Sequence, residues 1–285
     1  MSAGSTGAHR GAQASALPPP EREMSTWDPI RTAEFFDEYG EREWTRFEDG
    51  RTPGPSLTTH IRMLEGYVRP GDRVLDAGSG PGRFSLELVR LGAHVTALDI
   101  SPGQLELLRS RIPDVEAVVG DVTDLSRFGD DAFDATVCFG GPLSYVVDRA
   151  EAAVAELVRV TKPGGHVLVS VMGLGGAVIH FASIIVDLAR RDGAPKQLEI
   201  ARTGFLPEGD GYGHLAMRMY LWEELEALLA PHGEVVDGAA AGILPHLEVE
   251  EPAIRAVLEE FEQRLAHDPG SRSCGEHLVG VLRVA

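Results

Sequence analysis

The chain has 285 residues, is 43% hydrophobic and carries a formal net charge of −18, so it can bury a substantial core. The acidic balance argues against a protein that docks on nucleic acid, because counterion release needs clustered Lys and Arg. The two cysteines, Cys138 and Cys274, lie far apart without metal-ligand spacing. With an amino terminus that lacks an apolar signal segment, these features favour a reduced, cytoplasmic protein without metal or membrane association.

The amino-terminal part is expected to contain a tail followed by helices. Residues 1–23 are rich in Ser, Gly, Ala and Pro, so we expect a disordered tail there and a folded domain over 24–285. Residues 30–48 carry an aromatic face at helical spacing, and residues 56–68 read as a second helix. We therefore expect a helical cap over residues 30–69.

Residues 73–84 are the strongest local pattern in the chain. An apolar run typical of a buried strand ends there, and a helical period begins at Phe84. A strand that turns sharply into a helix needs residues without a Cβ, both for the turn and for close approach of a ligand. A dinucleotide fingerprint, G-x-G-x-x-G, would need glycine at position 83, where arginine stands, so a nicotinamide dehydrogenase is disfavoured. The glycines between strand and helix are Gly78, Gly80 and Gly82.

Strands and helices alternate through the middle of the chain. This alternation requires parallel pairing with right-handed crossovers and helices on both faces of the sheet. Ligands bind such sheets at the carboxyl ends of the strands, so Gly78, Asp99, Asp121 and Phe139 should meet in one site. The expected strands are 95–99, 115–119, 133–139 and 166–171, and the expected helices are 82–92, 102–112 and 149–161.

The carboxyl-terminal part departs from a minimal domain. Residues 174–189 are apolar at helical spacing but too short to span a bilayer. The connection 241–276 is longer than a hairpin needs. We expect a glycine- and charge-rich loop at 192–213, helices at 221–229 and 254–265, and strands at 234–240 and 277–284.

Taken in order, these motifs resemble the class I S-adenosylmethionine-dependent methyltransferases of the small-molecule type. The resemblance covers residues 70–172, from Asp-x-Gly-x-Gly-x-Gly to a Pro-Gly-Gly turn before the fifth strand. It implies a doubly wound, Rossmann-like α/β fold with seven strands, mostly parallel with an antiparallel seventh strand. It also implies S-adenosylmethionine as cofactor and a lid built by the insertion after strand five, 174–232. A helix that forms a homodimer is the alternative for this insertion. The aromatic helix either packs on the core or closes the cofactor site as a flap.

The cofactor contacts follow from strand ends and from the resemblance. Asp99 lies at the tip of the second strand, where a carboxylate can accept both ribose hydroxyls. The resemblance implies that Asp121 binds the adenine amino group and that Val122 packs on the ring. The expected cofactor-binding residues are Asp76, Gly78, Ser79, Gly80, Asp99, Ile100, Asp121, Val122 and Phe139.

Residues for the acceptor side are sought after strand four and in the insertion. Oxygen and nitrogen nucleophiles often need a base, for which His180 and His214 are the candidates. Tyr145, Arg218 and Tyr220 are candidate substrate contacts. Arg218 and Tyr220 alternate along an extended segment and so share one face, which either binds a carboxylate or forms a salt-bridged strand edge.

The predicted function is transfer of a methyl group to an oxygen or nitrogen of a small-molecule acceptor by in-line displacement. Three other functions stay open on the sequence, of which the nicotinamide dehydrogenase is disfavoured by Arg83. A protein or peptide methyltransferase is favoured if the insertion forms an open groove. A protein that binds S-adenosylmethionine without catalysis is favoured if no acceptor pocket exists.

Overall fold

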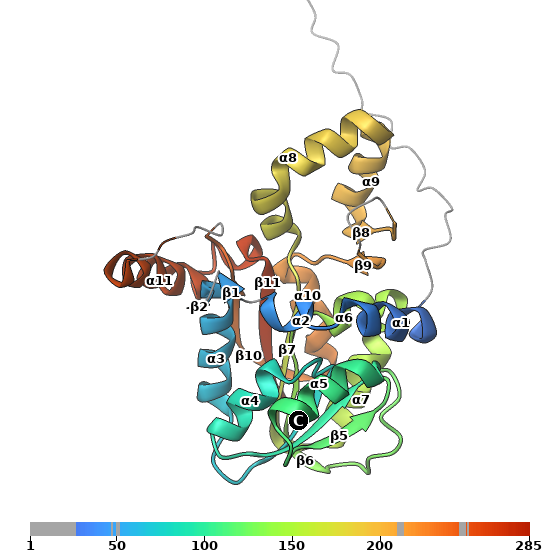
Figure 1. Ribbon diagram of the computed structural model, residues 1–285, viewed down its shortest axis with the longest axis vertical. Helices are drawn as coiled ribbons and strands as arrows, with labels where there is room; N and C mark the ends of the chain where they lie inside the picture. Colours follow the sequence, from blue (N-terminus) through green and yellow to red (C-terminus); the bar gives the residue numbers. More distant parts are fainter. Residues whose placement is uncertain (1–26, 47, 50–51, 210–213, 245–248, 250) are drawn as a thin grey trace, which may run out of the picture.

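The computed structural model describes residues 27–285 except 47, 50–51, 210–213, 245–248 and 250. The expected tail, 1–23, lies outside the described residues. At the centre is a sheet of seven strands in the order β10-β11-β7-β6-β3-β4-β5 (Figure 1). In chain order the strands are β3 (Arg73–Ala77), β4 (His94–Asp99), β5 (Glu116–Val119), β6 (Phe133–Cys138), β7 (Thr161–Met172), β10 (Gly233–Ala241) and β11 (His277–Val284).

Strand directions confirm the expected doubly wound α/β fold. Strand β3 is parallel to β4 and β6, and β4 is parallel to β5. The last strand, β11, runs antiparallel to both β7 and β10. Because the carboxyl ends of parallel strands meet at one edge, the residues that follow β3, β4, β5 and β6 are brought together there.

Helices cover both faces of the sheet and bury two apolar clusters. On one face lie α3 (Pro55–Tyr67), α4 (Arg83–Arg90) and α5 (Pro102–Arg111), whose apolar side chains pack with the sheet. On the other lie α7 (Ala150–Val160) and α10 (Trp222–Leu229). Cys138 is fully buried in β6, as a small apolar residue would be. The short helices α6 (Pro142–Tyr145), η1 (Val147–Arg149) and η2 (Ala230–His232) complete these layers.

The expected cap, 30–69, divides into two parts. The helix expected over 30–48 is broken at Gly40, whose positive φ of 55° ends α1 (Pro29–Tyr39) before α2 (Arg42–Thr45) begins. We call residues 27–46 the arm. Helix α3 belongs instead to the layer that covers the sheet. Between α2 and α3 the short strands β1 (Glu48–Asp49) and β2 (Thr52–Pro53) pair antiparallel.

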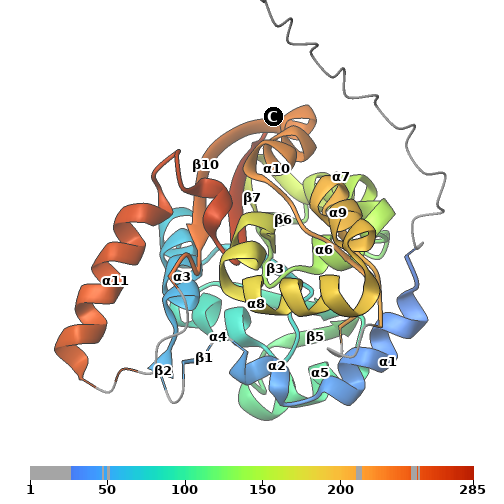
Figure 2. The same ribbon diagram turned by 90° about the horizontal axis from the view of Figure 1, so that it is seen from above.

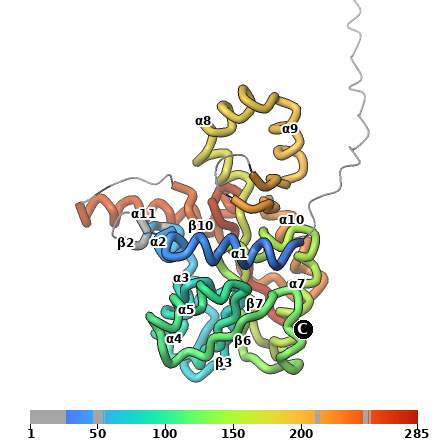
Figure 3. Tube along the Cα trace, turned by 45° about the vertical axis from the view of Figure 1, so that its right-hand side comes forward, coloured from blue at the N-terminus to red at the C-terminus, as the bar shows by residue number. Residues whose placement is uncertain are grey.

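Of the insertion expected over 174–232, α10 and η2 belong to the body, while the described residues 174–209 and 214–218, called the insertion below, stand off from the sheet. Helices α8 (Leu174–Asp192) and α9 (Ala194–Thr203) project away from the rest of the molecule in Figures 1 and 3. The loop expected from 192 is wrong over α9. Its boundaries match ordinary helix signals, since a proline stands at its start and Gly204 at its end. The insertion closes with the paired strands β8 (Phe205–Leu206) and β9 (Met217–Arg218).

The base of α8 is held against the body by backbone contact. A Cβ on Gly175 would lie 2.0 Å from the carbonyl oxygen of Ser273, and one on Gly176 would lie 2.1 Å from that of Gly275. Only glycine allows such an approach. The helix then kinks at Phe181, whose φ of −117° is not helical. The part of α8 before Phe181 is therefore anchored, and the part after it leaves the body.

The long connection after β10 is tied back by one buried carboxylate. Glu262 on α11 (Pro252–Ala266) accepts hydrogen bonds from the backbone N–H groups of Gly242, Ile243 and Leu244, at 2.7 to 2.9 Å. Helix α11 packs on α3 and β10 along one side of the molecule (Figure 2). The η3 turn (Arg272–Cys274) then leads into β11. Among the described residues, no helix is long and apolar enough to cross a membrane.

Candidate functional site

A pocket opens at the carboxyl edge of the parallel strands. Asp76 and Ser79, two of the nine expected cofactor-binding residues, do not belong to its lining. The arm and the loop after β6 complete the wall, with Trp27, Thr32, Phe36, Glu43 and Tyr145. The expected residues that line the pocket are Gly78, Gly80, Asp99, Ile100, Asp121, Val122 and Phe139.

The glycine loop has the geometry that its residue types require. Gly78 and Gly80 have positive φ angles of 78° and 52°, a conformation that L side chains rarely adopt. A Cβ on Gly78 would lie 2.3 Å from Cγ of Pro142 in the loop after β6. The backbone N–H groups of Gly78 and Ser79 both donate to the carbonyl of Leu98, at 2.7 and 3.0 Å. The loop is thereby fixed to the end of β4.

Asp99 is a buried carboxylate with room for further donors. Its Oδ2 accepts from the N–H of Gly80 at 2.7 Å, and its Oδ1 from the N–H of Ser101 at 2.8 Å. Burial raises the pKa of Asp99 to about 6, although these two backbone donors lower it. An ionised carboxylate can accept about four hydrogen bonds. A ligand that brings two hydroxyl groups would satisfy the remaining capacity and stabilise the charge.

Asp121 is held at the far end of the pocket by Trp27. Its Oδ1 accepts from the N–H and the hydroxyl of Thr123, at 2.7 and 2.8 Å, and its Oδ2 accepts from the indole N–H of Trp27 at 2.9 Å. The backbone N–H of Trp27 in turn donates to Asp148 at 2.9 Å. No sequence pattern around Trp27 pointed to this role, because the contact joins residues more than 90 positions apart.

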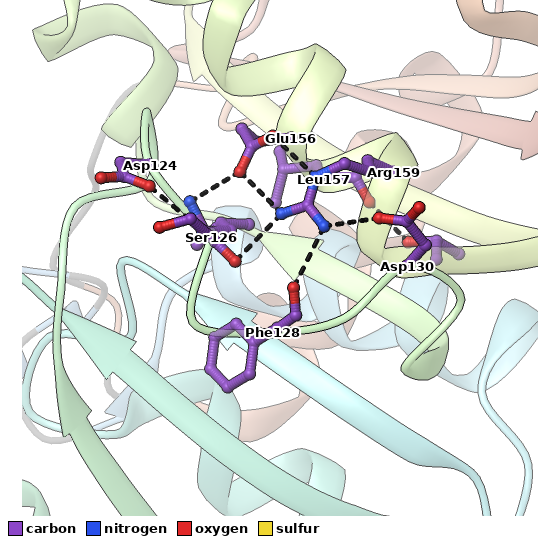
Figure 4. A network of polar contacts seen from close by, with 9 residues as sticks. Asp124, Ser126, Phe128, Asp130, Glu156, Leu157 and Arg159 are labelled. Carbon is purple, nitrogen blue, oxygen red and sulfur yellow. Dashed lines mark hydrogen bonds and ion pairs between the residues drawn. The ribbon is translucent and has the colours of Figure 1, made fainter.

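The loop that follows Val122 is braced by Arg159 of α7 (Figure 4). The guanidinium donates to the carbonyls of Leu125 and Phe128, both at 3.0 Å, and to the carboxylate of Asp130 at 2.8 Å. Glu156 accepts from the same guanidinium and from the N–H of Leu125, at 2.8 Å. These contacts fix the position of the loop that carries Asp121 and Val122.

Polar contacts attach the arm to α5. Asp37 accepts from the hydroxyl of Ser101 at 2.5 Å and from the N–H of Gly103 at 2.8 Å. The side-chain amide of Gln104 donates to the carbonyls of Phe36 and Gly40, at 2.7 and 3.0 Å. The arm is thus bound to the helix that follows Asp99, and it forms one wall of the pocket.

Asp76 and Ser79 lie behind the pocket wall. Asp76 is buried in β3, and its Oδ2 accepts from the hydroxyl of Ser85 on α4 at 2.6 Å. Burial raises the pKa of Asp76 to about 7. The side chain of Ser79 is also buried. In this position Asp76 ties β3 to α4, and it does not belong to the pocket lining.

The candidate residues of the insertion lie away from the pocket lining. His180 has its Nε2 3.0 Å from the carbonyl of Gly242 and its Nδ1 3.6 Å from the carboxylate of Glu276. His214 has its Nδ1 3.0 Å from the carbonyl of Leu215. Neither imidazole lines the pocket.

Arg218 and Tyr220 share one face, as their alternation predicts. The guanidinium carbon of Arg218 lies 4.8 Å from the ring centre of the buried Tyr220. Arg218 also pairs with Glu224 at 3.2 Å. Neither Arg218 nor Tyr220 lines the pocket, whereas Tyr145 does, with its ring 5.5 Å from that of Phe36.

Two buried histidines that the sequence did not single out lie under the pocket. The ring of His60 on α3 is 4.9 Å from that of Phe139 and 5.4 Å from that of His277. Burial lowers the pKa of His60 to about 4 and that of His277 well below its usual value. Within the described parts of the chain, no three His, Cys, Asp or Glu side chains gather in a way that could hold a metal ion.

Comparison with known proteins assigns the central region. Residues 74–165 match the methyltransferase domain family. The chain is 43% identical over 102 residues to a demethylmenaquinone methyltransferase of Renibacterium salmoninarum, covering 35% of this chain and 41% of that protein. It is 39% identical over 110 residues to a malonyl-[acyl-carrier protein] O-methyltransferase of Serratia marcescens, covering 39% and 42%. The chain spans about half the length, or less, of these relatives.

Solved structures share the fold over most of the chain. A methyltransferase of Thermotoga maritima superimposes with a TM-score of 0.57 at 19% identity, covering 88% of this chain and 99% of that one. The 1,6-didemethyltoxoflavin-N1-methyltransferase of Burkholderia thailandensis, solved with 1,6-didemethyltoxoflavin and S-adenosylhomocysteine, gives 0.52 at 19% identity, covering 96% and 98%. At these identities the likeness shows the fold alone. Sheet order, glycine loop and family match together show that residues 74–165 form a methyltransferase domain within a doubly wound α/β fold.

Proposed function

We propose that this protein transfers the methyl group of S-adenosylmethionine to an oxygen or nitrogen of a small-molecule acceptor by in-line displacement. The observation that carries the proposal is a single pocket in which Gly78, Gly80, Asp99 and Asp121 meet at the ends of three neighbouring strands. Glycine backbone, a buried carboxylate short of donors and an apolar wall fit a nucleoside that carries two ribose hydroxyls.

Each part of the pocket has a role in this function. The cofactor supplies an electrophilic methyl group on a sulfonium sulfur. Asp99 would accept from the ribose hydroxyls, while Asp121 and Val122 would hold the base. Gly78 and Gly80 let the ligand approach the backbone. The arm, through Trp27 and Phe36, would exclude water and keep the ligand in line with the acceptor.

We propose that residues outside 74–165, the region that matches the family, select the acceptor. Relatives that match this chain include methyltransferases of demethylmenaquinone and of a malonyl-[acyl-carrier protein], which are acceptors of different kinds. The insertion offers apolar side chains to solvent, so we propose a largely apolar acceptor that presents a hydroxyl or amine. The exposed apolar residues on α8 and α9 are Val178, Ile179, Phe181, Val186 and Leu198.

His180 and His214 remain the proposed bases. His180 lies in the anchored part of α8, so the acceptor would have to reach it there, whereas His214 would approach a bound acceptor when the insertion closes. Their hydrogen bonds to backbone carbonyls in the present arrangement are then exchanged for the acceptor. Arg218, Tyr220 and Tyr145 are proposed to contact the acceptor. Two copies joined through the exposed face of α8 are the alternative role of the insertion.

A methyl-transfer screen with radiolabelled S-adenosylmethionine tests this function. The intact protein is offered apolar alcohols and amines in one arm, and peptides or carrier proteins in the other. We expect label in the small-molecule products. Label only in peptides would establish the protein methyltransferase, and tight cofactor binding without transfer to either set would establish a binding protein.

A further inference from the structure

We infer that Glu43 of α2 and Arg46, the residue that follows α2, form an ion pair that recognises the amino and carboxylate groups at the methionine end of the cofactor. The inference rests on the proposed function and adds a specificity element to it. Both residues lie in the arm, outside the region 74–165 that matches the family.

The order of the strands shows which end of the ligand the pair would meet. Across the edge of the sheet, β5, β4, β3 and β6 are neighbours in that order. Asp121 follows β5, Asp99 ends β4, and the glycine loop follows β3. A nucleoside held between Asp121 and Asp99 must therefore extend its remaining part over the glycine loop toward the end of β6.

Glu43 lines this last part of the pocket, and Arg46 adjoins it through Glu43 and Gly140. The guanidinium Nη2 of Arg46 lies 2.8 Å from Oε1 of Glu43 and donates to the carbonyl of Gly140, which follows β6, also at 2.8 Å. Glu43 lines the pocket. A Cβ on Gly80 would lie 3.5 Å from Cγ of Glu43, so this side chain sits over the glycine loop.

The pair is held in place by a neighbouring aromatic residue. The ring of Trp44 has the guanidinium carbon of Arg83 at 4.6 Å and that of Arg111 at 4.3 Å. Arg111 also pairs with Glu41, just before α2. These cation–π contacts fix α2 on α4 and α5. Glu43 and Arg46 are therefore positioned before any ligand arrives.

The charges of the pair complement a zwitterion. The charged side chains among the described lining residues are Glu43, Asp99 and Asp121, all acidic, and Arg46 supplies the adjoining positive charge. The side chains of Arg46 and Glu43 are only 22% and 13% exposed. A buried ion pair contributes little net stability, so stability alone does not account for it. An amino acid group offers a carboxylate to the guanidinium fork of Arg46 and an ammonium to Glu43.

Two ligands that differ only in this part provide the test. S-adenosylhomocysteine carries the amino acid group, and 5′-methylthioadenosine lacks it. In calorimetry on the full chain, Arg46→Met and Glu43→Gln should each weaken S-adenosylhomocysteine about tenfold or more, as for hydrogen bonds to charged groups. Their affinity for 5′-methylthioadenosine should stay within about twofold. Arg42→Met is the matched control, because Arg42 lies on the same helix but contacts Tyr39 and Glu38. It should change neither affinity.

The outcomes separate this inference from the proposed function. Equal weakening of both ligands by Glu43→Gln would show that the pair only holds α2, and unchanged affinity for S-adenosylhomocysteine would show that it touches no ligand. Either result overturns the inference while the cofactor site stands. A wild-type protein that binds neither ligand would overturn the cofactor site itself. Glu43→Gln keeps the shape of the side chain, so it tests the contact with the amino acid group even if Arg46→Met does not fold.

Discussion

The arm and the insertion flank the same central sheet but are attached to it differently. The arm is bound by side chains to the pocket itself, through Trp27 to Asp121 and through Asp37 to Ser101 and Gly103. The insertion is held at its base by glycine–backbone contacts and then exposes apolar side chains. This difference suggests a division of labour, in which the arm completes the cofactor site and the insertion responds to the acceptor.

An exposed ion pair joins the two parts. Arg31 of α1 and Glu208 of the insertion lie 2.9 Å apart, with 44% and 42% of their side chains exposed. Pairs this exposed contribute little to stability because water and salt screen them. Breaking this pair would therefore cost little if the insertion moved relative to the arm.

Replacing the histidines of the insertion should have the largest effect on turnover alone. If one of them is the base, alanine at His180 or His214 should lower turnover by about 10²–10⁴-fold. Cofactor affinity should stay within a few fold, because neither imidazole lines the pocket. Steady-state kinetics beside calorimetry would separate the two quantities. Full turnover in both variants would leave proximity and desolvation as the mechanism and remove these residues from it.

A side chain at Gly80 should have the largest effect on the cofactor. Gly80→Val places a β-branched residue at a positive φ beside the ligand. The strain, about 1–3 kcal/mol, should lower stability, and the lost space should weaken S-adenosylhomocysteine binding by roughly 100-fold. Gly71→Val is the matched control, since Gly71 has a φ of +90° with nothing within 4 Å of a Cβ and lies outside the pocket. It should lower the melting temperature but not the affinity. Equal affinity losses in Gly80→Val and Gly71→Val would mean that backbone strain causes the loss, and that Gly80 has no particular role in the pocket.

Asp99 should give a smaller and pH-dependent effect. Asp99→Ala removes hydrogen bonds to a charged acceptor worth about 1.5–3 kcal/mol, so affinity should fall tenfold or more. In the wild type, ligand donors favour the ionised carboxylate, whose pKa without ligand is about 6. Binding therefore releases a proton below that pH, and affinity should fall as pH drops through 6, by up to about tenfold per unit. Calorimetry from pH 5 to 8 checks this. The same slope in Asp99→Ala would assign the titration to another group.

Weakening the contacts between the arm and α5 tests the role of the arm in cofactor binding. Asp37→Ala removes the acceptor for Ser101 and Gly103 and should weaken the cofactor by about fivefold to tenfold, given roughly 1–1.5 kcal/mol for such bonds. Arg31→Ala, also on α1, breaks only the exposed pair with Glu208 and should leave affinity within about twofold. If Arg31→Ala weakens cofactor binding more than Asp37→Ala does, the insertion takes part in cofactor binding, and the arm and the insertion do not have separate roles.

The smallest expected effect is a change in dynamics. Hydrogen exchange in α9 and in α8 beyond Phe181 should slow when acceptor is added to the complex with S-adenosylhomocysteine, and little when S-adenosylhomocysteine is added alone. In the arm, hydrogen exchange should slow when S-adenosylhomocysteine is added alone and change little when acceptor follows. Uniform protection of α8 in every state would favour a homodimer through that helix.

Short-range patterns in the sequence predict which strand-end residues meet in the pocket. Each strand is a short apolar run, and the residue at its end, such as Asp99 or Asp121, reaches the pocket by the rules of parallel sheets. Asp76 lies near the same edge within β3, yet its carboxylate accepts from Ser85 and does not belong to the pocket lining. That placement depends on the packing of α4, which spacing in the sequence does not reveal.

The arm and the insertion were less accessible from sequence for related reasons. Trp27, Glu43 and Arg46 reach the pocket only because the arm folds back over residues far along the chain. In the insertion, the many glycine and charged residues led to the prediction of a loop where α9 forms, although a proline and Gly204 mark the ends of that helix. Local signals of helix boundaries were present there, whereas the partners of the arm are set by tertiary contacts alone.

Calorimetric titration of the intact protein with S-adenosylhomocysteine and with NAD tests the central claim most directly. A pocket built from Gly78, Gly80, Asp99 and Asp121 should bind S-adenosylhomocysteine at one site per chain, and Asp99→Ala should weaken that binding. NAD should bind much more weakly, because arginine stands where the dinucleotide fingerprint needs its third glycine. Tighter binding of NAD, or binding of S-adenosylhomocysteine that Asp99→Ala leaves unchanged, would contradict the account.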